Sequence, residues 1–187
     1  MEIDVILDRL YELPAQSRAA LRSAISGVTY PKGHILLRAG KVEPMLYFIK
    51  RGIVRAYADS ECGDVTFWFG REGDTVISMK SYVAGEPGYE HVELLEACDL
   101  YALRTDTLRN LFANDIHIAN LGRKLAEREL IKTEERIIAA QFRTAQERYM
   151  ALMATSPDLL QRVQLCHIAS YLGITQVTLS RIRAGIR

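Results

Sequence analysis

Short apolar runs separated by glycine fill the stretch from Val28 to Leu103 and limit the possible folds more than any other feature. The runs are rich in β-branched and aromatic residues and span 35–37, 45–49, 53–57, 65–69, 92–95 and 100–103. Turns are expected at Gly40, Gly52, Gly63 and Gly73. Short strands at this spacing are typical of a β-sandwich or barrel. We therefore expect a jelly-roll, that is, a double-stranded β-helix.

After Leu103 the apolar residues follow helical spacing. The stretch 115–140 contains no proline and one glycine, and Leu121 and Leu125 share one face of the helix that it predicts. Such a helix is longer than a small domain needs, so we expect it to link two domains and to pair with a second copy. A helix packed on its own domain is the alternative. Shorter helices are expected over 3–13, 15–25, 106–113 and 145–154.

These patterns predict an α+β chain in three parts. They are a sensor domain over 1–113, a linker and dimerisation helix over 114–141, and a C-terminal domain over 142–187. The charges are divided unevenly, because residues 105–187 carry 12 of the 24 basic residues but 8 of the 23 acidic ones. A formal net charge of +1 therefore neither supports nor excludes a nucleic-acid partner.

Ordinary globular composition, with 49% hydrophobic residues, excludes a disordered or fibrous chain. The acidic start and the lack of a long apolar run predict a soluble, cytoplasmic protein without membrane contact. Cys62, Cys98 and Cys166 lie far apart, so they indicate neither a disulfide framework nor a zinc site.

The segment 165–184, LCHIASYLGITQVTLSRIRA, predicts a helix-turn-helix. Gly173 stands where the turn needs a left-handed backbone, and Thr175 stands at the N-cap of the second helix. Apolar residues fit the shared core of two crossing helices at Ile168, Leu172, Ile174, Leu179 and Ile182.

The exposed face of the second helix predicts contact with a DNA major groove. It holds no acidic residue, and glutamine pairs well with adenine, arginine with guanine, and valine with the thymine methyl group. With the cap, the predicted DNA-binding residues are Thr175, Gln176, Val177, Thr178, Ser180, Arg181 and Arg183. A helical hairpin that packs or binds protein is the alternative.

The whole chain resembles the Crp/Fnr family of bacterial transcription regulators. The resemblance rests on Arg38-Ala39-Gly40, on 46–54, on Glu72-Gly73-Asp74, on 96–100 and on 168–183. It implies a cyclic-nucleotide-binding-type sensor domain, a homodimer, a pseudo-palindromic DNA site and RNA polymerase as a partner. It also implies contacts to base edges by Gln176, Val177 and Arg181. The family's winged-helix domain has a β-hairpin wing, which we expect to be short or missing here.

The residues that hold cyclic AMP in the family are not found here. Ile77-Ser78 and Gly88-Tyr89 stand at the places of the Gly-Glu and Arg-Ser pairs, so we expect no physiological cyclic AMP binding. An unknown small-molecule effector would instead meet Ser78, Tyr89, Glu90 and His91. Three cysteines are too few for an iron–sulfur cluster, and no haem, metal or other cofactor is predicted.

Two other classes of protein compete with this interpretation. An enzyme of the cupin type would need clustered histidine ligands, and the β-rich region has His34 and His91 alone, so no catalytic residue is predicted. A sensing module that does not bind DNA on its own is the stronger alternative. Neither the effector, the target genes nor the sign of regulation follows from these residues.

Overall fold

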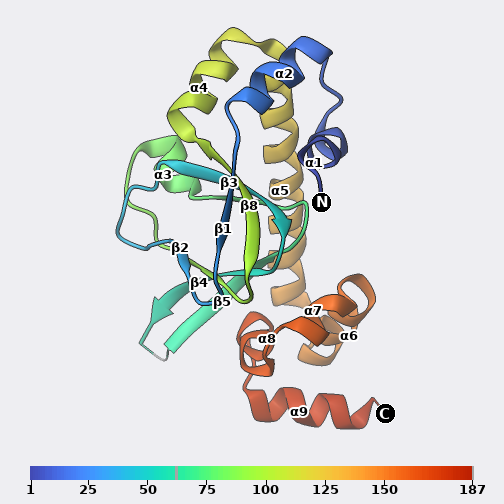
Figure 1. The fold of residues 1–187 in the computed structure, drawn as a ribbon. Coiled ribbons are helices and arrows are strands. Elements are labelled where there is room, and N and C mark those ends of the chain that lie inside the picture. The colour runs from blue at the N-terminus through green and yellow to red at the C-terminus, as the bar shows by residue number, and fades with distance from the viewer. Residues whose placement is uncertain (62, 187) are drawn as a thin grey trace. The chain divides into compact units, whose positions relative to one another are not determined.

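The computed structural model describes residues 1–61 and 63–186, so Cys62 and Arg187 lie outside the described residues. The fold is α+β, with eight strands among the described residues that form two four-stranded sheets (Figure 1). The predicted jelly-roll architecture is therefore confirmed. The chain divides into two compact units, one made of residues 1–56 and 69–129 and the other of residues 57–68 and 130–187.

The order of strands in both sheets is that of a roll rather than a simple meander. One sheet has the order β1-β8-β3-β6 and consists of Ser26–Tyr30, Cys98–Arg104, Met45–Arg51 and Thr75–Ile77. The other has the order β2-β7-β4-β5 and consists of Ile35–Leu37, His91–Leu94, Val54–Ser60 and Gly63–Gly70. Consequently β5 is the last strand of its sheet.

Helices cover the apolar side of the first sheet. They are α1 (Ile3–Leu10), α2 (Ala15–Ser23), α4 (Thr105–Asn114) and the beginning of α5 (Ile116–Phe142). Their buried side chains form one core with Phe48 of β3 and Leu103 of β8. Other members of this core are Ile3, Ile6, Leu7, Leu13, Leu21, Leu46, Leu108, Ile118 and Leu121. The sequence pattern did not predict β1, β6 or the six-residue helix α3 (Met79–Ala84).

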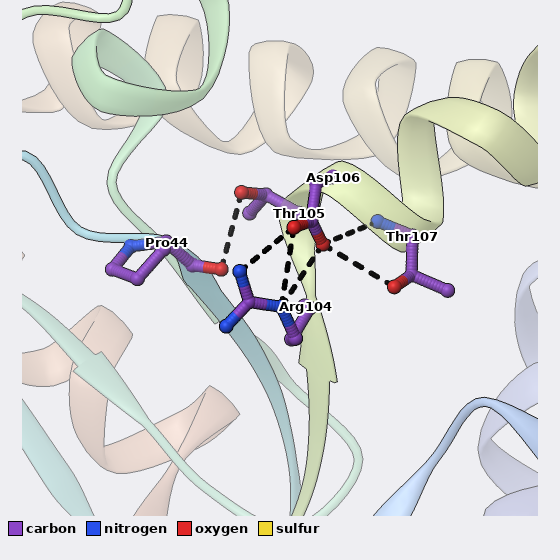
Figure 2. A network of polar contacts seen from close by, with 5 residues as sticks. All are labelled: Pro44, Arg104, Thr105, Asp106 and Thr107. Atoms are coloured by element: carbon purple, nitrogen blue, oxygen red, sulfur yellow. Dashed lines mark hydrogen bonds and ion pairs between the residues drawn. The ribbon is translucent and has the colours of Figure 1, made fainter.

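A polar network fixes the junction where β8 ends and α4 begins (Figure 2). Arg104 donates to both carboxylate oxygens of Asp106, and the Thr107 amide donates to the same carboxylate. These donors, Arg104 first, lower the pKa of Asp106 to about 2. The Thr105 amide and hydroxyl both donate to the Pro44 carbonyl, at 2.9 and 3.1 Å. The network therefore ties α4 to the residue that precedes β3.

The second unit is helical apart from the residues of the β4–β5 hairpin. It holds the second half of α5, then α6 (Ala145–Thr155), α7 (Pro157–Arg162), α8 (Leu165–Tyr171) and α9 (Gln176–Gly185). Thr144 and Glu147 form a capping box that starts α6. The core of this unit is formed by Tyr149, Leu152, Leu159, Val163, Ile168, Ala169, Leu172 and Leu179.

One boundary between the two compact units falls inside the helix that the sequence predicts as a linker over 114–141. The division falls between residues 129 and 130, inside α5. The reason is that the first half of α5 contributes Ile118 and Leu121 to the first unit's core, whereas the second half packs in the other unit. A continuous helix gives no local sequence signal at such a boundary.

Candidate nucleic-acid interface

The turn between α8 and α9 is a Schellman motif. Gly173 adopts a left-handed conformation with φ of 66°, its amide donates to the Ser170 carbonyl, and the Ile174 amide donates to the Ala169 carbonyl, both at 3.0 Å. Thr175 then caps α9 by accepting the Thr178 amide at 3.1 Å. Ile168, Leu172 and Leu179 are buried between the two helices. The geometry is that of a helix-turn-helix.

The second helix, α9, presents a polar and basic outer face. Val177 is 60% exposed, and Gln176, Ser180, Arg181 and Arg183 are exposed around it. None of these residues is acidic, so the face can approach a polyanion without repulsion. Gln176 and Arg181 carry the donors and acceptors that pair with base edges, and the Val177 methyl groups suit a thymine methyl.

Three of the predicted DNA-binding hydroxyls are already bonded within the helix-turn-helix. The Thr175 and Thr178 hydroxyls lie 3.0 Å apart and share a hydrogen bond, and the Ser180 hydroxyl donates to the Gln176 carbonyl at 3.0 Å. These groups stabilise the start of α9. Gln176, Val177, Arg181 and Arg183 are exposed beside these hydroxyls, and sequence spacing could not separate the two groups.

Arg148 on α6 connects the turn to the end of α5. Its guanidinium donates to the carbonyl of Leu172, the C-cap of α8, at 2.8 Å. It also donates to the carbonyl of Arg143 at 2.6 Å, just after α5. The sequence pattern did not predict a role for Arg148, because a side chain that bridges two helix ends produces no periodic pattern of residue types.

The second half of α5 exposes a stripe of apolar side chains. Phe142 is 79% exposed, and Leu130, Ile131, Ile137 and Ile138 are exposed as well. Leu130 and Ile137, like Ile131 and Ile138, lie seven residues apart and so on one side of the helix. Leu121, one of the two predicted dimer contacts, is 3% exposed and packs in its own unit's core, so it is not available to a partner. Leu125 is half-buried.

The predicted effector residues separate into buried and exposed side chains. Ser78 and Glu90 are 1% and 8% exposed and meet at Gly88, where an added Cβ would lie 2.6 Å from the Ser78 hydroxyl oxygen and 3.0 Å from a Glu90 oxygen. Tyr89 is exposed instead. His91 accepts the Ala39 amide through Nδ1 at 3.4 Å. The Ser78 hydroxyl and the Glu90 carboxylate thus fill the space that a side chain at position 88 would enter.

The second sheet contains an ion pair between a buried arginine and a half-buried glutamate, which the sequence pattern did not predict. Arg55 on β4 and Glu93 on β7 approach to 2.9 Å. Both residues belong to runs that look like ordinary alternating strand residues, so their pairing could not be recognised before the register of β4 and β7 was known.

Residues 1–61 and 63–186 form neither a metal site nor a membrane-spanning helix. No three histidine, cysteine or acidic side chains there gather in a way that could hold a metal ion. His34 stacks on Tyr30 with the ring centroids 4.2 Å apart. No helix in that part of the chain has the length and hydropathy needed to cross a membrane.

Comparisons with known proteins agree with this architecture. Residues 27–115 match the family model of the cyclic nucleotide-binding domain. No curated protein sequence matches the chain.

Solved structures of bacterial regulators share the fold. CLP of Xanthomonas campestris, a c-di-GMP-responsive global regulator, is 17% identical with a TM-score of 0.71, covering 92% of this chain and 91% of that one. FixK2 of Bradyrhizobium japonicum is 20% identical with a TM-score of 0.71, covering 87% and 84%. The catabolite activator protein of Thermus thermophilus is 19% identical with a TM-score of 0.61, covering 97% and 86%.

Proposed function

This chain carries a cyclic nucleotide-binding domain within the fold of the Crp/Fnr regulators, and from this premise we propose that it is a sequence-specific DNA-binding transcription regulator. The observation that carries the proposal is the outer face of α9. There Gln176, Val177 and Arg181 are exposed on a helix that a Schellman turn and the Thr175 cap hold in place. A bacterial regulator of this kind acts in the cytoplasm, where the chromosome lies.

The protein acts as a homodimer in this proposal. The apolar stripe of α5 supports it, because isoleucine and phenylalanine side chains this exposed are stabilised by burial against an equivalent helix. A two-fold dimer places its two recognition helices about 34 Å apart, one turn of DNA. The target is therefore a pseudo-palindromic site with two half-sites.

Cyclic AMP does not control this regulator in our proposal. The buried Glu90 carboxylate and the Ser78 hydroxyl support this, because they crowd Gly88, which aligns with the family's arginine, and a buried carboxylate repels an anion. Any effector that meets these residues is therefore neutral or cationic. CLP, which has the same fold, is described as responsive to c-di-GMP, an anion, and the Glu90 environment argues against that ligand here as well.

The test is the capture of genomic DNA fragments by the purified protein at physiological salt, followed by sequencing. We expect enrichment of a two-fold symmetric sequence, because two copies of α9 read the two half-sites. The double variant Gln176→Ala/Arg181→Ala removes the base-reading groups but leaves the core of the helix-turn-helix intact, so the enrichment should disappear.

The control variant is Gln161→Ala, which changes an exposed residue of α7 in the same unit. It should retain the wild-type enrichment. If the wild-type protein enriches no sequence, with or without added cell extract as a source of effector, the alternative of a sensing module that does not bind DNA replaces this proposal.

A further inference from the structure

A serine hydroxyl joins α8 to the β4–β5 hairpin inside the second unit. The Ser170 hydroxyl donates to the Asp64 carbonyl at 3.1 Å and accepts the Thr66 amide at 2.9 Å. Asp64 and Thr66 are two residues apart on β5, so their backbone groups face the same edge of the strand. The Ser170 hydroxyl therefore makes a hydrogen bond with both the Asp64 carbonyl and the Thr66 amide, as the backbone of a neighbouring strand would.

An arginine joins the same two elements to the second half of α5. The Arg136 guanidinium lies 5.3 Å from the ring centroid of Tyr171 on α8 and 5.8 Å from that of Phe67 on β5. Both distances fall within the range of cation–π attraction. Burial lowers the pKa of the Arg136 guanidinium, which nevertheless stays charged at neutral pH. Arg136 is thus a half-buried cation with aromatic rings from two other elements around it.

These contacts, which we call the α8 clamp, consist of Ser170, Tyr171, Arg136, Phe67 and the backbone of 64–66. With the Arg148 bond to the Leu172 carbonyl, they restrain the last turn of α8 from β5, from α5 and from α6. The last turn of α8 leads directly into Gly173 and α9. Any rotation of the helix-turn-helix on α5 must therefore break the clamp.

We propose that Ser170 and Arg136 are positioning residues for DNA binding, which hold the recognition helix α9 in one orientation on the second half of α5. This inference rests on the proposed function. In a dimer paired through α5, a fixed orientation in each protomer sets the distance between the two recognition helices. The clamp therefore matters for binding two half-sites at once and not for binding a single half-site.

The experiment compares Ser170→Ala with the wild type in fluorescence anisotropy titrations against two DNA duplexes. One duplex carries the complete symmetric site recovered by the capture experiment, and the other carries a single half-site. We expect binding to the complete site to weaken roughly tenfold, because the advantage of simultaneous engagement is lost. Binding to the single half-site should stay within about twofold.

Hydrogen exchange measured without DNA supplies an independent result. The Thr66 amide should exchange faster in Ser170→Ala, because its acceptor is removed, whereas Ser170→Thr keeps the hydroxyl and should restore both slow exchange and tight binding. Arg136→Gln removes the charge from between the rings and should resemble Ser170→Ala. Thr155→Ala is the matched control, since that hydroxyl donates to the Ala151 carbonyl of its own helix.

The possible results distinguish the two proposals. Wild-type protein that prefers no DNA sequence contradicts the proposed function, and the positioning role fails with it. The positioning role alone is overturned if the wild-type protein binds DNA sequence-specifically and Ser170→Ala leaves either of two measurements unchanged. These are the exchange of the Thr66 amide and the affinity for the complete site.

Discussion

At the scale of single residues, Asp106 contributes to stability through its charge. Its carboxylate accepts hydrogen bonds from Arg104 and from the Thr107 backbone and side chain, which lower its pKa from 3.8 to about 2 (Figure 2). A group whose pKa is lower in the folded state than in the unfolded state stabilises the fold above the unfolded pKa. That contribution is lost as the pH falls from about 4 toward 2.

Asp106→Asn should therefore lower the melting temperature at pH 7 and reduce its dependence on pH between about 4 and 2. The measurement is thermal unfolding followed by circular dichroism across this pH range. Asp59→Asn, on an exposed strand end, is the comparison. A carboxyl titration by NMR that gave Asp106 an ordinary pKa near 3.8 would contradict the network described at this junction.

The sequence of α9 does not reveal which of its polar side chains bond within the helix and which extend outward. Thr178, Ser180, Gln176 and Arg181 all belong to one polar helix face, so the sequence predicted all four as DNA contacts. The hydroxyls bond to the cap or to the preceding turn, whereas the two longer side chains extend outward. Whether a short hydroxyl faces a ligand or its own backbone depends on the rotamer, which residue type does not specify.

At the scale of elements, α5 combines two different apolar stripes in one helix. Its first half places Ile118 and Leu121 in a core, and its second half exposes Ile137 and Ile138. Replacing a buried leucine by alanine removes packing that folding requires, whereas replacing an exposed isoleucine removes contacts that only a partner would make.

Leu121→Ala should lower the free energy of unfolding by roughly 2–5 kcal/mol, measured by denaturant titration. Ile137→Ser should leave that free energy nearly unchanged per protomer but shift the sedimentation profile from dimer toward monomer. Ala140→Ser, on a different side of α5, is the control for the second variant. A monomeric wild-type protein, or an unaffected dimer in Ile137→Ser, would refute the dimer contact proposed for this stripe.

The sequence predicted correctly whether a segment is a helix or a strand wherever its apolar pattern was distinct. The helix over 115–140 became Ile116–Phe142, and the predicted strand runs all became strands. The helix α3 was missed because six residues give too little periodicity, and Leu121 was assigned to a partner because periodicity cannot tell a domain's own core from another copy. The contacts of Ser170 with β5 join residues more than 100 positions apart, which no local pattern reports.

At the scale of the whole molecule, the expected DNA complex depends on few cations. Arg181 and Arg183 are the exposed basic residues of α9, so a dimer would bring two such pairs to its site. Each phosphate contact adds about −0.9 to the slope of log affinity against log salt. In the proposed dimer, affinity for DNA should therefore depend strongly on both protomers being engaged.

Arg183→Ala should reduce the magnitude of that slope by about 2, because one phosphate contact is lost in each of two protomers. Val177→Ala should leave the slope unchanged and instead relax the preference at one base position of each half-site. Binding titrations at several salt concentrations measure the slope for each variant, and the same titrations with different bases at one position of each half-site measure the preference. An unchanged slope in Arg183→Ala would mean that Arg183 does not contact the DNA backbone.

The bond between Ser170 and β5 also bears on how the protein behaves at high concentration. As the last strand of its sheet, β5 has an outer edge, and the backbone groups along such an edge can recruit a strand from another molecule. The hydroxyl of Ser170 occupies two of those groups, at Asp64 and Thr66, and helix α8 stands over them. Sheet growth at Asp64 and Thr66 must first displace the helix, so the contact that we propose to orient α9 should also protect the protein against aggregation.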